Sequence, residues 1–92
     1  MSAVPSATVM VHAAKLAIEH DRPIFLDYYN DSVLKTCCIG VSAESKCLVK
    51  SDTEYTSPIE SMTRLVSEKA IIIMTENSLY IVSTDIPMKR VV

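Results

Sequence analysis

The longest hydrophobic part of the chain lies in its last quarter, where two apolar runs flank a short polar stretch. Residues 70–74 read AIIIM and residues 79–83 read LYIVS, with TENS at 75–78 between them. Adjacent isoleucines crowd a helix but fit the pleated surface of a sheet, and a run that is apolar on both sides is typical of a strand covered on each face. Asparagine in the connection tolerates positive φ. The pattern therefore predicts a hairpin at the centre of a sheet.

A helical period dominates near the N-terminus. Residues 7–20, ATVMVHAAKLAIEH, are rich in alanine and contain neither glycine nor proline, which favours a helix. Ser6 or Thr8 can cap its first turn. We expect the helix to end by Arg22-Pro23, because the residue before a proline is pushed out of the α region.

The apolar part of this helix is wider than one sheet face can cover. On a helical wheel His12, Lys15 and Glu19 share one narrow polar arc, and apolar residues fill the rest. Either loops of the same chain or a second molecule must cover the remainder, on an alanine-rich side that permits close approach. Tyr55, in the polar stretch 51–57, is a second candidate for a contact, since tyrosine is enriched at interfaces. The alternative is an ordinary loop in which its ring packs. The interface candidates are Met10, Ala13, Ala14, Ala17, Ile18 and Tyr55.

The period changes to two after the helix. Residues 23–29, PIFLDYY, alternate as a strand, NDS at 30–32 has turn chemistry, and VLKTCCIGV at 33–41 follows as the return strand of a hairpin. Gly40, the only glycine, indicates a bulge or a close backbone approach near the end of that strand. Residues 47–51 then form a short strand.

Residues 58–67 fit two patterns. The sequence SPIE at 57–60 has the form of a capping box with proline at the first helical position, which favours a helix. The alternation over 59–65 favours a strand. We prefer the strand, because the apolar run at 70–74 needs an antiparallel partner. Pro87 cannot donate to a ladder, so residues 87–92 are expected to form a C-terminal arm or an edge strand.

Together these elements predict one α+β domain over residues 1–92, with a loose N-terminus over 1–5. Short strands that follow a single helix favour an N-terminal helix packed on a five- or six-stranded, mainly antiparallel sheet. In one version of this fold the sheet curls into a small open barrel. A 92-residue chain buries about 64% of its unfolded surface, which is enough for one core.

Composition narrows the function classes. Hydrophobic residues make up 49% of the chain and charged residues 22%, which excludes the composition of disordered proteins and favours contact with a partner or a second copy. The net charge of −2 gives no global attraction for nucleic acid. The apolar runs are shorter than the ~20 residues that span a bilayer, and the N-terminus lacks the basic start of a signal peptide. A soluble, unexported protein without a membrane partner is expected.

Cysteine usage points to a reducing compartment such as the cytoplasm. Cys37 and Cys38 are adjacent, so in a strand they point to opposite faces, and Cys47 makes the number odd. No cysteine or histidine pair has the spacing of a zinc site, and a single glycine excludes glycine-rich phosphate loops. We therefore expect no metal, no cofactor and no small-molecule substrate.

Catalytic candidates are equally sparse. His20-Asp21 is the most suggestive pair, because a carboxylate can orient an imidazole for base work. No serine or cysteine nucleophile can be placed beside it. His20 also falls at the C-terminal end of the predicted helix, where it interacts favourably with the last carbonyls. The sequence predicts no catalytic residue and favours a protein that is not an enzyme.

Three stretches resemble short uncharacterised proteins of large DNA viruses of algae and protists. They are RPIFLDYYNDS at 22–32, EYTSPI at 54–59 and TENSLYIVS at 75–83, and the resemblance covers about the last three quarters of the chain. It implies a virus-encoded product, such as a minor virion component. It carries no catalytic residue over to this chain.

Two function hypotheses follow. The first is a non-enzymatic interaction or structural module that self-associates through the alanine-rich helix side or an edge strand. The rival is a small β-barrel that binds single-stranded nucleic acid, although Asp27 and Asp31 beside its rings argue against it. Its binding residues would be Tyr28, Tyr29, Lys35, Lys50, Lys89 and Arg90.

Overall fold

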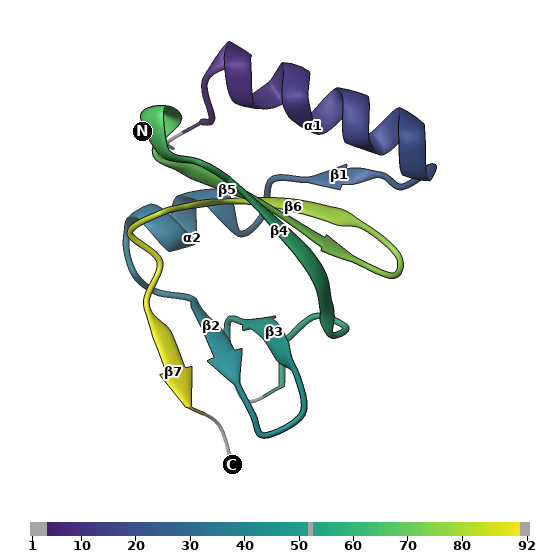
Figure 1. The fold of residues 1–92 in the computed structure, drawn as a ribbon. Coiled ribbons are helices and arrows are strands. Elements are labelled where there is room, and N and C mark those ends of the chain that lie inside the picture. The colour runs from purple at the N-terminus through teal and green to yellow at the C-terminus, as the bar shows by residue number, and fades with distance from the viewer. Residues whose placement is uncertain (1–3, 52, 91–92) are drawn as a thin grey trace.

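The chain folds into a long helix and two mixed β-sheets, as a computed structural model shows for residues 4–51 and 53–90 (Figure 1). One sheet has four strands in the order β1-β6-β5-β4, and the other has three in the order β3-β2-β7. The α+β prediction is confirmed. The elements are α1 (Ala7–His20), β1 (Ile24–Phe25), α2 (Tyr29–Val33), β2 (Cys38–Val41), β3 (Lys46–Val49), β4 (Ile59–Leu65), the 3₁₀ turn η1 (Val66–Glu68), β5 (Ala70–Thr75), β6 (Leu79–Ser83) and β7 (Met88–Arg90).

Helix α1 begins and ends as its sequence predicts. The side-chain oxygen of Ser6 accepts a hydrogen bond from the backbone N–H of Val9 at 3.3 Å, which satisfies one free donor of the first turn. Asp21 follows the last turn in the left-handed conformation, with φ of 55°, and its N–H donates to the carbonyl of Ala17. The helix therefore ends just before Arg22-Pro23.

The hairpin of β5 and β6 lies at the centre of the four-stranded sheet, as predicted. Ile72 pairs with Ile81 and Ile73 pairs with Tyr80, and all three isoleucines are buried. Both sides of β5 are covered because the two sheet faces contact different parts of the chain. The buried positions of β5 explain why its sequence is apolar without alternation.

Strands β4 and β7 confirm two further predictions. Residues 59–65 form a strand antiparallel to β5, with an irregular register between Ile59 and Ser61, so the helical reading of this segment is wrong. Residues 88–90 form an edge strand of the smaller sheet. The rest of the predicted C-terminal arm, residues 91–92, and residues 1–3 of the predicted loose N-terminus lie outside the described residues.

The hairpin predicted over residues 23–41 is wrong. Strand β1 has two residues and runs parallel to β6, the segment Tyr29–Val33 is helix α2, and β2 starts only at Cys38. The cause is a long-range contact: the buried Ser32 side chain accepts a hydrogen bond from the backbone N–H of Ser83 at 2.8 Å and donates one to the carbonyl of Tyr29 at 2.6 Å. The bond to Ser83 holds α2 against β6.

The single, mainly antiparallel sheet is also wrong. The strands form two sheets, and each contains a parallel pair, β1 with β6 and β2 with β7. Within the described residues they do not close into a barrel. Gly40 marks no bulge, because it lies in a regular register opposite Cys47 and Lys89 and its φ is not positive.

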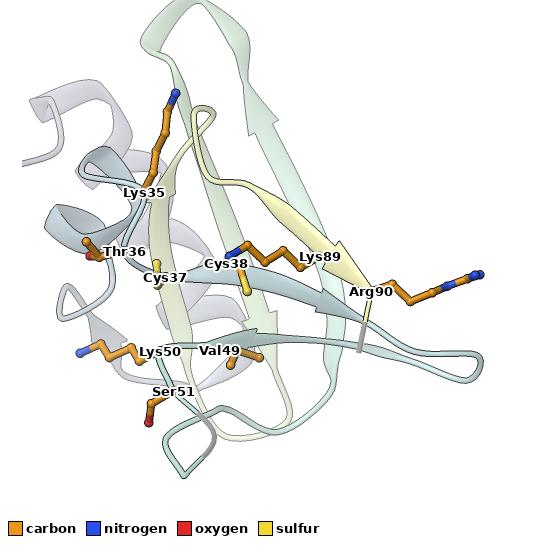
Figure 2. A pocket seen from close by; sticks show the side chains of 9 residues that line it. All are labelled: Lys35, Thr36, Cys37, Cys38, Val49, Lys50, Ser51, Lys89 and Arg90. Atoms are coloured by element: carbon orange, nitrogen blue, oxygen red, sulfur yellow. The ribbon is translucent and has the colours of Figure 1, made fainter. Parts of the chain in front are cut away.

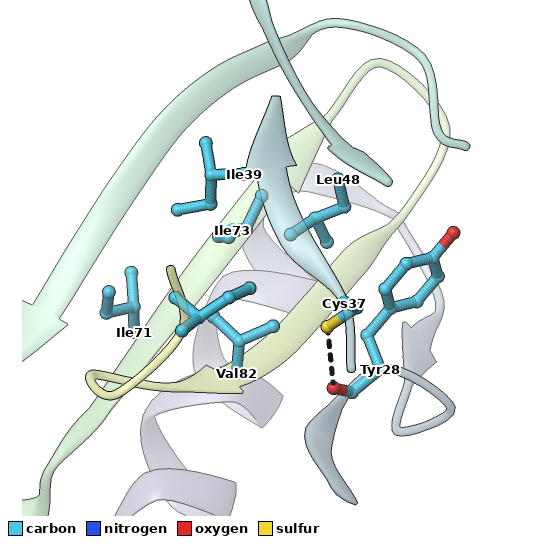
Figure 3. Packing of buried hydrophobic residues seen from close by; sticks show 8 residues of the cluster. Tyr28, Cys37, Ile39, Leu48, Ile71, Ile73 and Val82 are labelled. Carbon is cyan, nitrogen blue, oxygen red and sulfur yellow. Dashed lines mark hydrogen bonds between the residues drawn. The ribbon is translucent and has the colours of Figure 1, made fainter. Parts of the chain in front are cut away.

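Two hydrophobic clusters hold the layers together. Ile71, Ile73 and Val82 of the larger sheet face Ile39 and Leu48 of the smaller one, as Figure 3 shows. On the other side, the alternate residues of β5 and β6 pack against α1. Figure 1 shows the helix lying over that face of the sheet. The four-stranded sheet therefore lies between the helix and the three-stranded sheet.

Candidate functional site

The inner side of α1 is committed to the core. Val9 and Ala13 are fully buried against the four-stranded sheet, and Met10, Leu16 and Ala17 pack partly against the same cluster. Three of the five helical interface candidates, Met10, Ala13 and Ala17, thus pack within the chain. Their contacts stabilise the fold and leave the opposite side of the helix to be explained.

The outward side of α1 carries a second apolar stripe. Ala7, Val11, Ala14 and Ile18 are all exposed, and the branched side chains of Val11 and Ile18 are 54% and 83% exposed. The positions are four, three and four residues apart, which places them on one side of a helix. We refer to these four residues as the outward stripe. Ala14 and Ile18 were among the sequence candidates; Ala7 and Val11 were missed, although the same spacing in the sequence is a signal for them.

Tyr55 does not extend this stripe. Its side chain is 64% exposed, and it forms an isolated bridge with Val49 of β3 in the three-stranded sheet. That sheet covers the face of the four-stranded sheet opposite α1. The sequence candidates therefore lie on two separate surfaces rather than one.

A shallow hollow of about 280 Å³ lies on the smaller sheet (Figure 2). Four basic residues line it: Lys35 from the turn after α2, Lys50 from the end of β3, and Lys89 and Arg90 from β7. These are four of the six residues in the nucleic-acid hypothesis. Figure 2 shows their charged ends pointing in different directions rather than toward one point.

Lys50 forms ion pairs within the molecule. Its Nζ lies 3.8 Å from Asp27, 3.6 Å from Asp31 and 3.6 Å from Glu54, and 4.6 Å above the ring centre of Tyr28. Burial lowers the pKa of Lys50, but the three carboxylates raise it by more, so its net pKa is above the ordinary value. The Lys50 charge is therefore largely compensated inside the molecule.

The tyrosines of the nucleic-acid hypothesis are not presented as stacking platforms. Tyr28 is buried under Lys50 and meets Tyr80 edge to face at 5.4 Å, and burial together with nearby Asp27 and Glu54 raises its pKa to about 12. Tyr29 is partly buried against the core beneath α1. A base cannot stack on a ring whose faces are already covered.

The three cysteines are free thiols with different surroundings. Cys37 is buried, its Sγ lies 3.7 Å from the carbonyl of Tyr28 (Figure 3), and burial raises its pKa to about 11. Cys38 and Cys47 are half-buried and share the outer face of the smaller sheet. Burial is the larger cause that raises the pKa of Cys47, and the nearby Cys38 raises it further. Neither Cys37 nor Cys47 is activated as a nucleophile, because activation needs a lowered pKa and burial raises both.

Metal and acid–base chemistry find little support in the described residues. In residues 4–51 and 53–90, no group of three or more His, Cys, Asp or Glu side chains is placed to hold a metal ion. His20 Nε2 lies 3.9 Å from Glu19 Oε1 at the exposed end of α1, and Asp21 serves as the residue that ends the helix. Among the helices that the structure describes, none has the length and apolar character to span a membrane.

Comparison with known proteins adds no relative. The chain matches no family model, no curated protein and no solved structure. No property of a matched protein therefore bears on the function of this chain.

Proposed function

We propose that this protein is a non-enzymatic interaction module that self-associates through the outward stripe of α1. The observation that supports this proposal is the exposure of Val11 and Ile18 on the side of the helix that turns away from its own sheet. Fully burying a valine or isoleucine side chain is worth about 1.5–3 kcal/mol. The fold gains little of that free energy at Ile18 and only part of it at Val11, so a partner can supply the rest.

The different surroundings of the two sides of α1 support the same proposal. Val9 and Ala13 already fix the helix to the sheet, so apolar residues on the opposite side are not needed for that attachment. The small side chains of Ala7 and Ala14 allow a second element to approach the helix backbone closely. Exposed apolar residues in one continuous row mark contact sites more often than scattered ones do.

The test is the solution mass as a function of concentration. Light scattering on the wild-type chain is expected to show mass rising toward a dimer, and Ile18→Glu is expected to abolish that rise. Val66→Glu is the matched control, because Val66 is 76% exposed on η1, outside the stripe. A wild-type chain that stays monomeric at millimolar concentration would refute self-association. Equal loss in both variants would refute the role of the stripe.

Binding of single-stranded nucleic acid is a second candidate function. Lys35, Lys89 and Arg90 have no ion-pair partner within residues 4–51 and 53–90, and all three line the hollow on the smaller sheet. They can contact phosphates, although the buried Tyr28 removes one stacking ring. Salt-dependent binding of an oligonucleotide that is lost in the Lys89→Glu, Arg90→Glu double variant would support it. No binding at low salt would dismiss it.

The sequence resemblance supports a proposal about the setting. We propose a virus-encoded product of a reducing compartment, and a self-associating module suits a minor virion component. The three free cysteines agree with such a compartment. Mass spectrometry of purified particles of a virus that encodes this sequence would detect the protein or exclude it from the particle.

A further inference from the structure

We infer that the partner on the outward stripe is the same helix of a second copy, in antiparallel orientation, with Ile18 against the partner's Ala7 and Val11 against the partner's Ala14. This inference rests on the proposed self-association and specifies its geometry. The argument uses the spacing of the stripe, the sizes of its side chains and the orientation of the two helices.

The spacing of the stripe fits a helical partner. Ala7, Val11, Ala14 and Ile18 alternate by four and three residues, which is the pattern by which two helices pack side chains of one into gaps of the other. Val4 continues the spacing one step before the helix and is also exposed. The inner side of α1 has the same spacing in Val9, Ala13 and Leu16 and faces a sheet, so the period permits a helical partner without requiring one.

The sizes of the side chains indicate the orientation. In one row of positions the residues are branched, Val11 and Ile18, and in the other they are alanines, Ala7 and Ala14. An antiparallel pair sets each branched residue against an alanine, so all layers have similar thickness. A parallel pair would set alanine against alanine and isoleucine against isoleucine, which gives alternately thin and thick layers. Cores pack best when large and small residues face each other.

A two-fold axis satisfies this arrangement. Ile18 meets the partner's Ala7, and the partner's Ile18 meets Ala7. In the same way Val11 meets the partner's Ala14, and the partner's Val11 meets Ala14, so the two-fold axis passes midway between Val11 and Ala14. Such a contact uses one patch on both copies and closes at two subunits. The dipoles of two antiparallel helices also place opposite partial charges side by side at each end of the contact.

The size of the contact sets the expected affinity. Helix α1 has 14 residues, so the contact is about 21 Å long and one helix wide. This is at the small end of protein interfaces. We therefore expect a dimer that dissociates on dilution rather than a permanent one.

Disulfide trapping tests the orientation. Ala7→Cys and Ile18→Cys are made separately in a Cys38→Ser, Cys47→Ser background, which removes the two half-buried thiols and leaves the buried Cys37. One variant is labelled with ¹⁵N, the two are mixed and oxidised, and mass spectrometry counts mixed and like dimers. Both substitutions lie at exposed positions, and circular dichroism checks that the variants are folded.

The antiparallel pair is expected to give mixed dimers that exceed each like dimer at least tenfold. Like dimers in excess would show parallel pairing and overturn the inference. A wild-type protein that forms a dimer by light scattering, but whose variants show no trapping in the mixture, would place the contact elsewhere and overturn the inference while leaving self-association intact. A strict monomer by light scattering would overturn both.

Discussion

Ser32→Ala tests whether helix α2 is held by one buried hydroxyl. Ser32 has no exposed surface, and its Oγ accepts the backbone N–H of Ser83 at 2.8 Å while donating to the carbonyl of Tyr29 at 2.6 Å. Alanine removes both bonds and leaves the Ser83 N–H buried without its acceptor. The bond to Ser83 links segments 51 residues apart, so its loss affects the attachment of α2 to the sheet rather than the helix itself.

The magnitude follows from two opposing contributions. An unsatisfied buried donor costs about 1–3 kcal/mol. Alanine has a higher helix propensity than serine, which returns about 0.5 kcal/mol. The free energy of unfolding should therefore fall by about 0.5–2.5 kcal/mol. For a chain of this length each kcal/mol corresponds to roughly 4–8 °C in Tm.

Urea unfolding and amide hydrogen exchange are the assays. The urea midpoint should fall without a change in the slope m, and the Ser83 amide should exchange faster than in the wild type. Ser67→Ala is the control, because Ser67 is exposed on η1 and a surface substitution of this kind changes stability by about 0.5 kcal/mol or less. An unchanged midpoint with full protection of the Ser83 amide would refute the role assigned to Ser32.

Three further predictions concern the core, the reactivity of the thiols and the pH dependence of stability. Ile73 is fully buried on the central strand, so Ile73→Ala should lower the free energy of unfolding by about 2–5 kcal/mol and Ile73→Val by about 0.5–1.5 kcal/mol; equal urea midpoints for the two variants would contradict the packing. Iodoacetamide at pH 8 should label Cys38 and Cys47 well before Cys37, as peptide mapping can show, because Cys37 is buried and its pKa is raised to about 11; equal rates would place Cys37 at the surface. Burial also raises the pKa of Tyr28 to about 12. The folded chain therefore holds the protons of Cys37 and Tyr28 more tightly than the unfolded chain does. Their contribution to the free energy of unfolding is complete below about pH 9 and is lost as the pH rises toward about 12. A urea midpoint that stays constant from pH 8.5 to 11 would contradict this sign.

The sequence determined the elements whose signals are local. Alanine-rich residues between Ser6 and Pro23 define α1, because capping and helix propensity act within a few positions. The apolar runs on either side of residues 75–78 define the β5-β6 hairpin for the same reason. The need of β5 for an antiparallel neighbour also decided in favour of a strand at 59–65.

Only the tertiary structure decided the segment between α1 and β2. The stretch NDS suits a turn between strands and a short helix equally well, and the burial of Ser32 against Ser83 selects the helix. Parallel pairing of β1 with β6 and of β2 with β7 joins segments far apart in the chain, so no local pattern encodes it. The basic hollow is a consequence of the second pairing, which brings Lys89 and Arg90 beside β2.

The candidate interface shows the same division within one helix. The width of the apolar arc of α1 was visible in the sequence, and it predicted that part of the helix would lack cover from its own sheet. Which part could not be predicted, because Val9 and Val11, or Ala13 and Ala14, are chemically the same residues on different sides of the helix. Packing against β5 and β6 buried Val9 and Ala13 and left Val11 and Ala14 exposed. The rotation of α1 about its own axis is set by contacts with β1 and with strands more than 50 residues away, and those contacts exist only in the folded chain.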